Sequence, residues 1–369
     1  MFRNYRLKDY DFKLILMILA LSAVGVVAIG SAEESLQLKQ FLGALAGFAI
    51  MIAISFFNYN TLIKLNWLMY LGNLVLLVLV IITGEDAGGA QRWLKIGGLQ
   101  FQPSETAKIL LILFFAQYIM KYKEKLNTAK VILSCVVLIA IPWLLIFEQP
   151  DLSTSIMIMV IFCIIMFSGG LSYKIILGIL AVAIPVVAIT LSIVLQPDNT
   201  LLEDYQKNRI LAFKDPEQYA GEEAYQQLNS IMAIGSGQLN GKGYKNNELT
   251  SVKNGNFISE AQTDFIFSVI GEEFGFKGCV IVIVLLMGIA LECISVSRRA
   301  KDIAGRIIAA GMGGLVAVQG FFNIGVATFI LPNTGLPLPF VSYGLTSLMS
   351  LYIGMGFVLN VRLQAKKGN

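Results

Sequence analysis

Long apolar runs separated by short polar segments dominate this chain. Runs long enough to cross a hydrocarbon core of about 30 Å occur repeatedly along it. They predict membrane helices rather than a membrane barrel, because barrel strands would alternate apolar and polar residues over about 10 positions. We expect ten transmembrane helices, near residues 12–30, 37–57, 65–83, 104–120, 130–147, 152–168, 172–195, 264–297, 303–330 and 340–361.

Basic residues are divided unevenly between the two sides that these spans define. Seventeen Lys and Arg residues fall on the side of the N-terminus, and the short loops of the other side hold only Lys39, Arg92 and Lys95. Because positive charge stays in the cytoplasm, both termini are predicted to be cytoplasmic. The first run has no small-residue cleavage site before Glu33, so we read it as a retained helix.

One outer connection is much longer than the others. Residues 196–262 follow the seventh span and contain helix-like patterns at 206–219 and 222–234, then a glycine-rich, turn-like stretch at 235–244. A long loop with apolar positions of its own is expected to fold over the membrane surface. We therefore expect an all-α polytopic membrane protein, with residues 1–369 as one domain that carries this large extracytoplasmic loop between helices 7 and 8.

The stretch 258–276 brings carboxylates into the start of an apolar run. Read as a helix, it places Asp264, Ser268 and Glu272 on one stripe. An ionised carboxylate in a membrane segment costs at least ~2.5 kcal/mol and normally faces a protein interior or a wet cavity. Asp264 is therefore the leading candidate for chemistry. The alternative is that Thr263 caps the helix and Asp264 only meets the positive end of the helix dipole.

Composition narrows the chemistry further. Apolar residues make up 56% of the chain and charged residues 14%, which excludes a soluble domain of this size. Because the chain has no histidine, histidine triads, histidine metal ligation and histidine proton relays are excluded. Acid–base work falls to Asp, Glu, Lys or Tyr. The four cysteines lie singly in apolar runs, so neither a disulfide framework nor a zinc site is indicated.

Other unusual polar motifs also fall on the predicted outer side. After the third span, Arg92 could meet a phosphate and Trp93 suits a membrane interface, although an ordinary interfacial loop explains both equally well. Glu105 and Lys108 are spaced to pair on one helix face. A structural ion pair is favoured over catalysis there. Asp151, in a short hairpin, could cap the next helix or hold a cation or a sugar hydroxyl.

The last outer segment, residues 331–344, contains three prolines and two glycines and cannot continue a helix. Irregular backbone at membrane depth is tolerated only where protein or a water-filled cavity covers it. With Asn323 as a polar group beneath it, the segment is predicted to form a cavity wall, the alternative being a rigid loop.

Six blocks of this sequence together resemble one family, the SEDS proteins of shape, elongation, division and sporulation, which include RodA and FtsW. The blocks occur in one order over most of the chain: GAQRWL with FQPSE, QPDLST, NRILAFKDP, GSGQLNGKGY, SEAQTDFIFSVIGEEFG and PNTGLPLPFVSYG. One departure is Ser259, where many relatives have proline. The RodA-like branch fits better than FtsW, because the tails are short.

The resemblance implies a ten-helix peptidoglycan glycosyltransferase of the bacterial plasma membrane. Such an enzyme polymerises the undecaprenyl-pyrophosphate-linked precursor lipid II at the outer face of the membrane. The family's essential aspartate falls on Asp264 and its functionally sensitive tryptophan on Trp93. Its Glu–Lys pair falls on Glu105 and Lys108. The hairpin aspartate and the large-loop arginine fall on Asp151 and Arg209.

The chemistry requires a base for the acceptor hydroxyl and positive charge for the leaving diphosphate. We assign Asp264 as the base and expect Arg92, Lys108 or Arg209 to stabilise the diphosphate. Further substrate contacts are expected at the following residues: Trp93, Glu105, Asp151, Glu260, Thr263, Asn323 and Ser342.

A divalent cation, Mg²⁺ or Mn²⁺, held by Asp151 and Asp264 is a further expectation. The implied partner is a class B penicillin-binding protein, a transpeptidase that touches the outer loop and helices eight and nine, together with other elongation or division proteins. No nucleic acid is expected. Two alternatives stay open, a flippase for lipid-linked precursors and a non-catalytic scaffold. The absence of a detectable internal repeat weakens the transporter reading.

Overall fold

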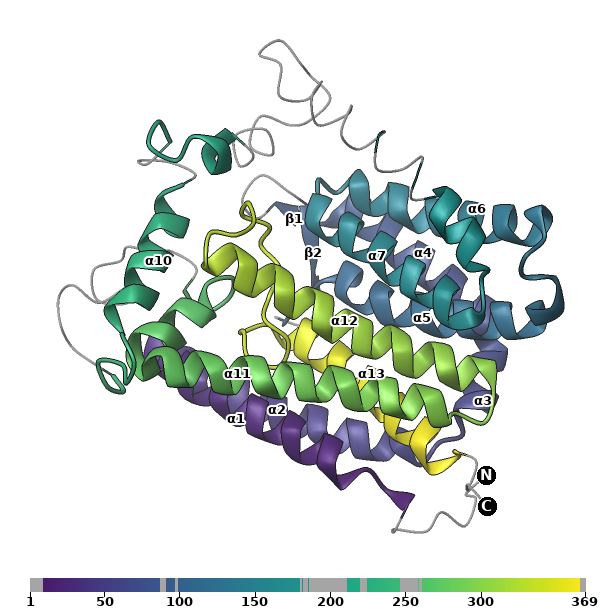
Figure 1. Ribbon diagram of the computed structural model, residues 1–369, viewed down its shortest axis with the longest axis horizontal. Helices are drawn as coiled ribbons and strands as arrows, with labels where there is room; N and C mark the ends of the chain where they lie inside the picture. The colour runs from purple at the N-terminus through teal and green to yellow at the C-terminus, as the bar shows by residue number, and fades with distance from the viewer. Residues whose placement is uncertain are drawn as a thin grey trace.

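The protein is a bundle of long helices with one small sheet at one end (Figure 1). The computed structural model describes residues 9–86, 91–96, 99–179, 181, 185, 211–219, 224–245, 258 and 261–365. The helices are α1 (Phe12–Ala32), α2 (Glu34–Ser55), α3 (Tyr59–Leu62), α4 (Asn66–Thr83), α5 (Pro103–Lys121), α6 (Ala129–Phe147), α7 (Leu152–Gly169), α10 (Tyr225–Ser236), α11 (Ile266–Arg299), α12 (Ile303–Ala327) and α13 (Leu345–Leu363). Two 3₁₀ turns, η2 (Ile63–Leu65) and η3 (Lys123–Lys125), follow α3 and α5.

Within the described residues, eight helical segments are long and apolar enough to cross a membrane. They are α1, α2, α3 with α4, α6, α7, α11, α12 and α13, and they confirm eight of the predicted runs. The predicted run 104–120 is also a helix, α5, which is less apolar. Of the predicted run 172–195, residues 173–179 are helical and most of the rest lies outside the described residues.

Two helices occupy the centre of the bundle. α12 packs against α11, α7, α5 and α13, while α5 packs against α4, α7, α12 and α13. Most of the α5 surface is buried, which lets it carry polar side chains such as Glu105 and Lys108 into the interior. By contrast, large apolar side chains of α4, including Leu68 and Val75, face outward. A membrane helix needs apolar residues where it meets lipid. The enclosed helix α5 can therefore be less apolar than α4.

A small antiparallel sheet replaces the loop expected after the third span. Its strands β1 (Glu85–Asp86), β2 (Gln91–Ile96) and β3 (Leu99–Phe101) follow one another in space as in sequence. Trp93 lies opposite Glu85, and Leu94 lies opposite Phe101. The sheet connects α4 to α5 and positions Arg92 and Trp93 on one strand.

The two ends of the bundle differ in what they contain. One end, the terminus end, holds the start of α1 and the end of α13, where Gln364 bonds to Asn58 (Figure 1). The other, the loop end, holds the sheet, the hairpin between α6 and α7, the start of α11 and the segment 331–344. In the large predicted loop, α10 confirms the second helix-like pattern and packs against α11 and α12.

Candidate active site

The turn at residues 261–265 presents Asp264 just ahead of α11. The sequence predicted a helix from about Asp264, with a Thr263 cap as the alternative reading; the helix starts two residues later, so Asp264 precedes it and Thr263 is not its N-cap. The helix begins at Ile266, and its N-cap is Phe265, which makes no side-chain cap. Ser268 and Glu272 of the predicted polar stripe are in the helix and buried.

Tertiary hydrogen bonds hold this turn out of the helix. The Thr263 carbonyl accepts from Ser342 Oγ at 2.5 Å, and the Asp264 carbonyl accepts from Asn323 Nδ2 at 2.7 Å. The backbone N–H of Tyr343 donates to the Gln262 carbonyl at 2.9 Å. Because these carbonyls bond to α12 and to the segment 331–344, the backbone orientation of Asp264 is fixed from two sides.

The Asp264 carboxylate is partly exposed and faces Gly335. Gly335 has φ of +68°, and a Cβ added there would lie 3.3 Å from Asp264 Oδ2. A glycine is therefore favoured at this position for two reasons, the left-handed backbone and the close approach of the carboxylate. The arrangement leaves Asp264 partly exposed beside a packed, non-helical segment.

Side-chain amides of α12 satisfy the irregular backbone of the segment 331–344. Asn323 Nδ2 donates to the Leu336 carbonyl at 2.8 Å, and Gln319 Nε2 donates to the Pro337 carbonyl at 2.9 Å. Ser342 Oγ accepts from the Leu338 N–H at 2.7 Å. Protein therefore covers this segment, as irregular backbone at membrane depth requires.

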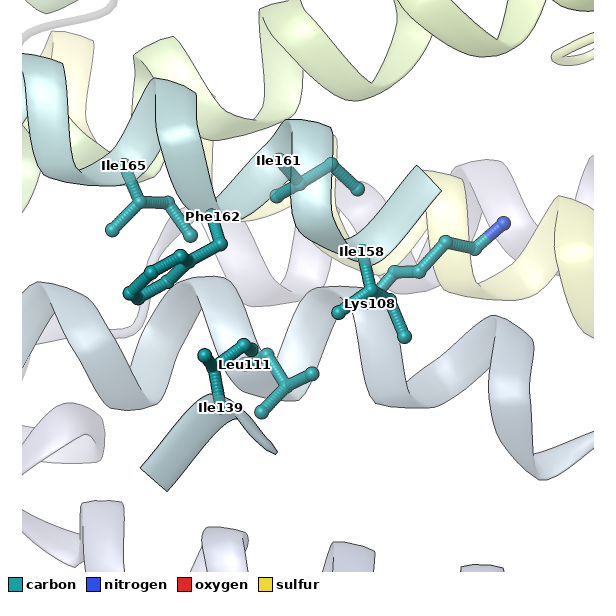
Figure 2. A pocket seen from close by; sticks show the side chains of 7 residues that line it. All are labelled: Lys108, Leu111, Ile139, Ile158, Ile161, Phe162 and Ile165. Atoms are coloured by element: carbon teal, nitrogen blue, oxygen red, sulfur yellow. The ribbon is translucent and has the colours of Figure 1, made fainter. Parts of the chain in front are cut away.

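Glu105 and Lys108 form a buried ion pair on α5. Lys108 Nζ lies 2.7 Å from Glu105 Oε1, and Lys108 is 1% exposed. The same ammonium donates to Gln319 Oε1 at 2.9 Å. Its stem lies among apolar side chains of α5, α6 and α7, while the nitrogen points away from Ile158 and Phe162 (Figure 2). This environment supports the structural ion pair that the spacing predicted.

The hairpin between α6 and α7 connects the sheet to the same region. Asp151 caps α7, with Oδ1 accepting from the Thr154 N–H at 3.1 Å, and is buried. The Arg92 guanidinium donates to the Gln149 carbonyl at 3.3 Å and to the Pro150 carbonyl. Two residues beyond Asp151, the Ser153 hydroxyl of α7 donates to the Thr334 carbonyl.

These contacts bring most of the predicted site residues into one connected region. Asp264, Thr263, Asn323 and Ser342 are joined directly, and Gln319 links them to Glu105 and Lys108. Arg92 contacts the hairpin that holds Asp151, and Ser153, just after this hairpin, donates to the Thr334 carbonyl. The partly exposed Trp93 follows Arg92 on β2. Arg209 and Glu260 lie outside the described residues.

Gln319, Ser153 and Gly335 were not predicted as site residues. For Gln319 a signal existed, because a glutamine one helical turn before Asn323 is unusual in an apolar helix.

Three side-chain acceptors near the turn remain available for a ligand. Within the described part of the chain, Asn323 Oδ1, Asn333 Oδ1 and Thr334 Oγ1 are buried and have no hydrogen-bond partner. Buried polar atoms are rarely left in this state, so each such atom calls for an explanation. A substrate rich in hydroxyl and amide N–H groups would supply the missing donors.

Acidic side chains supply the candidate acid–base groups at the loop end. Across the described ranges, no three His, Cys, Asp or Glu side chains gather as a metal-binding cluster. In a chain without histidine, a carboxylate such as that of Asp264 is the type of side chain that serves as a general base.

Comparison with known proteins shows which family matches this chain. The family of FtsW, RodA and SpoVE, described as cell cycle proteins, matches residues 10–367. The chain is 34% identical over 363 residues to the peptidoglycan glycosyltransferase MrdB of Escherichia coli, covering 96% of this chain and 94% of that protein. It is 32% identical over 374 residues to a probable peptidoglycan glycosyltransferase FtsW of Geobacter metallireducens, covering 98% and 96%.

Solved structures also match along nearly the whole length. The rod shape determining protein RodA of Thermus thermophilus matches with a TM-score of 0.70 and 26% identity, covering 97% of this chain and 98% of that one. A chain from a structure of a peptidoglycan synthase complex, in which polymerization and crosslinking are coordinated, matches with a TM-score of 0.78 and 26% identity. That match covers 96% of this chain and 97% of the other.

Proposed function

Because this chain belongs to the FtsW, RodA and SpoVE family of cell cycle proteins, we propose that it polymerises lipid II into glycan strands, with Asp264 as general base. Curated relatives from both the MrdB and FtsW branches are peptidoglycan glycosyltransferases, and this chain shares that activity. The observation that carries the assignment of Asp264 is its partly exposed carboxylate, fixed on a non-helical turn beside buried acceptors without partners.

The proposed reaction transfers the growing glycan from a lipid diphosphate to a sugar hydroxyl. The 4-hydroxyl of the acceptor attacks the anomeric carbon of the donor, Asp264 accepts the hydroxyl proton, and the lipid diphosphate leaves with the bonding electron pair. A positioned general base contributes roughly 10²–10⁴-fold. Because the diphosphate is already a good leaving group, the reaction needs no second carboxylic acid, unlike glycoside hydrolysis.

Cationic groups at the loop end stabilise the leaving diphosphate in this mechanism. Arg92, held by the hairpin carbonyls, suits that task, because arginine binds phosphate through a planar fork of donors. Lys108 is buried and already donates to Glu105 and Gln319, so it suits the fixing of surrounding groups better than phosphate binding. Arg209, outside the described residues, remains a second candidate for the diphosphate.

A divalent cation is compatible with this site only in combination with substrate. Mg²⁺ commonly takes one or two carboxylates together with substrate phosphates. Asp264 is partly exposed and would supply one such carboxylate, whereas Asp151 is buried and caps α7 through Oδ1, so it would need its other oxygen for the cation. Bound there, the cation would supply charge neutralisation at the diphosphate. The proton transfer to Asp264 does not depend on it.

We place the loop end outside the bacterial plasma membrane, in a ten-helix protein with both termini in the cytoplasm. The excess of basic residues on the terminus side supports this orientation. The proposed partner is a class B penicillin-binding protein, which would contact the large outer loop together with α11 and α12. The similarity to a chain of a peptidoglycan synthase complex supports such a partner.

Among the cellular roles, we favour elongation, because the chain resembles the RodA-like branch; its identity to relatives of the two branches is similar, at 34% to MrdB and 32% to FtsW. Expression of this chain in cells depleted of one or the other protein tests that choice. Rescue of rod shape supports elongation, and rescue of division instead would reverse the assignment.

Purified protein, with its transpeptidase partner, and lipid II provide the test of the proposed function. We expect glycan polymer from the wild type and none above background from Asp264→Asn or Asp264→Ala, with thermal unfolding unchanged. Undiminished polymer from Asp264→Ala would remove Asp264 from the mechanism. Failure of the wild type to polymerise would favour the flippase or scaffold alternatives, which transport assays in vesicles would then distinguish.

A further inference from the structure

Gln319 bridges two parts of the site that share no element. It lies on α12 one helical turn before Asn323 and is fully buried. Its Oε1 accepts from Lys108 Nζ at 2.9 Å, and its Nε2 donates to the Pro337 carbonyl at 2.9 Å. A single side chain thus joins the ion pair of α5 to the segment that faces Asp264.

Satisfying the Pro337 carbonyl alone would not require this arrangement. Any donor, including a hydroxyl or an ordered water, could serve that carbonyl. A buried ammonium needs acceptors, and a glutamine side chain provides a donor and an acceptor at a fixed separation. A glutamine at position 319 can therefore bind the Lys108 ammonium and the Pro337 carbonyl at the same time.

The contacts continue from Gln319 to the proposed base. Pro337 follows Leu336, whose carbonyl accepts from Asn323, and Asn323 also holds the Asp264 carbonyl. Gly335, which lies against the Asp264 carboxylate, belongs to the same short segment. A shift of the Pro337 carbonyl would consequently move the surface against which Asp264 rests.

We propose that Gln319 is a positioning residue for glycosyl transfer, which couples the Glu105–Lys108 ion pair to the backbone segment facing Asp264. This inference rests on the function proposed above. Gln319 does not touch the reacting atoms in this proposal. It keeps the Asp264 carboxylate correctly positioned relative to the acceptor hydroxyl during the chemical step.

The chain contains a matched control for this glutamine. Gln364 is also buried, accepts from Lys301 Nζ at 2.6 Å through Oε1, and donates to Asn58 Oδ1 at 3.1 Å. It therefore makes the same kind of bridge at the terminus end, away from Asp264. Gln364→Met removes a lysine–glutamine bridge without touching the site.

Steady-state polymerisation kinetics and thermal unfolding of the purified complex test the inference. In Gln319→Met we expect kcat to fall about ten- to hundred-fold, as for a small misplacement of reacting groups. KM should stay unchanged, so that kcat and kcat/KM fall together, as expected when an interaction of the transition state is lost. Gln364→Met should lose a similar amount of thermal stability and keep the wild-type kcat.

A second variant covers the case in which Gln319→Met fails to fold. Gln319→Glu keeps the size and the acceptor for Lys108 but loses the donor to Pro337, so kcat should again fall at constant KM. Wild-type kcat in either folded variant, or equal kcat losses in the Gln319 and Gln364 variants, would overturn the inference alone. A wild type that makes no polymer would overturn the proposed function, and this inference with it.

Discussion

Two buried polar networks lie at opposite ends of the bundle, and they differ in how completely they are satisfied. At the terminus end, Asn360 accepts from the Tyr59 N–H at 2.9 Å and from Gln364 Nε2 at 2.6 Å, and it donates to the Ser55 carbonyl at 2.6 Å. Asp302 there accepts from the Tyr59 hydroxyl at 2.8 Å and from the Gly305 N–H at 2.8 Å.

The loop-end network uses the same residue types but remains open. Asn323 donates twice, to the Asp264 and Leu336 carbonyls, and its own Oδ1 lacks a partner in the described part of the chain. A closed polar network fixes the packing of helices, whereas an open one retains binding capacity at a cost in stability. The comparison therefore favours the loop-end network as the candidate site.

The largest expected contrast is between the asparagines of the two networks. Asn360→Leu leaves the Tyr59 N–H and the Ser55 carbonyl without partners, at about 1–3 kcal/mol for each orphaned group. Its polymerising activity per folded molecule should stay at the wild-type level. Asn323→Leu releases the Asp264 turn, and its activity should fall about 10²-fold.

Thermal unfolding and polymerisation of the same purified samples separate these effects. If Asn360→Leu lost activity per folded molecule as strongly as Asn323→Leu, the two networks would not differ in function. Gln364→Met leaves the Tyr59 N–H and the Ser55 carbonyl bonded to Asn360, so it should cost less stability than Asn360→Leu and serves as the control.

The membrane environment explains why much of the fold could be read from the sequence. Lipid offers no partner for backbone groups, so each long apolar run has to become a helix. The end of the run that starts at Phe12 is found within a few residues of its prediction. The sheet was missed, because 85–101 contains glycines and charges typical of a loop, and its strands are short.

The site was only partly predictable, because its key feature is tertiary. An apolar pattern extends through Asp264 into α11, and nothing in that pattern reveals that Asn323 and Ser342 hold the turn outside the helix. The role of Gln319 likewise depends on Lys108, which is 211 positions away in sequence. Asp264 could be chosen as a candidate from the sequence, because an ionisable residue at the edge of a membrane segment is costly and usually functional.

Each end of the bundle also contains an ion pair, and the two pairs differ in how deeply they are buried. Lys108→Met leaves Glu105 buried without its cation and should cost about 3–5 kcal/mol. Lys13 pairs with Glu292 at 2.7 Å but is 71% exposed, so Lys13→Met should cost about 0–1 kcal/mol. Chemical unfolding measures both. The double variant Glu105→Gln with Lys108→Met should be more stable than Lys108→Met alone, and equal stability would contradict the buried-charge explanation.

Two glycines with positive φ provide a comparison of smaller expected size. Gly335 at the loop end has φ of +68°, and Gly170 at the end of α7 has φ of +100° with open space around it. Alanine in a left-handed conformation costs about 1–2 kcal/mol at either position. Only Gly335→Ala places a methyl group against the Asp264 carboxylate, so only this variant should lose polymerising activity. Equal activity in the two variants would argue against close packing at Asp264.

Substitution of Asp11 has the smallest expected effect. It tests whether a carboxylate at the terminus end affects stability without affecting polymerisation. It caps α1, with Oδ1 accepting from the Leu14 N–H at 3.1 Å. Burial raises its pKa above the ordinary 3.8, the bond to Leu14 opposes this, and the charge of Glu292 adds to it while Arg362 opposes it. The folded protein therefore holds this proton more tightly than the unfolded chain does.

The sign of the pH dependence follows from that raised pKa. The contribution of Asp11 to stability is fully present below pH 3.8 and is lost as the pH rises through the folded-state pKa. Asp11→Asn keeps a capping oxygen and does not titrate. Thermal unfolding between about pH 4 and pH 7 should show the wild type losing stability relative to Asp11→Asn as the pH increases, with no change in polymerisation. A relative gain with increasing pH would mean that the Leu14 N–H and Arg362 outweigh burial at this carboxylate.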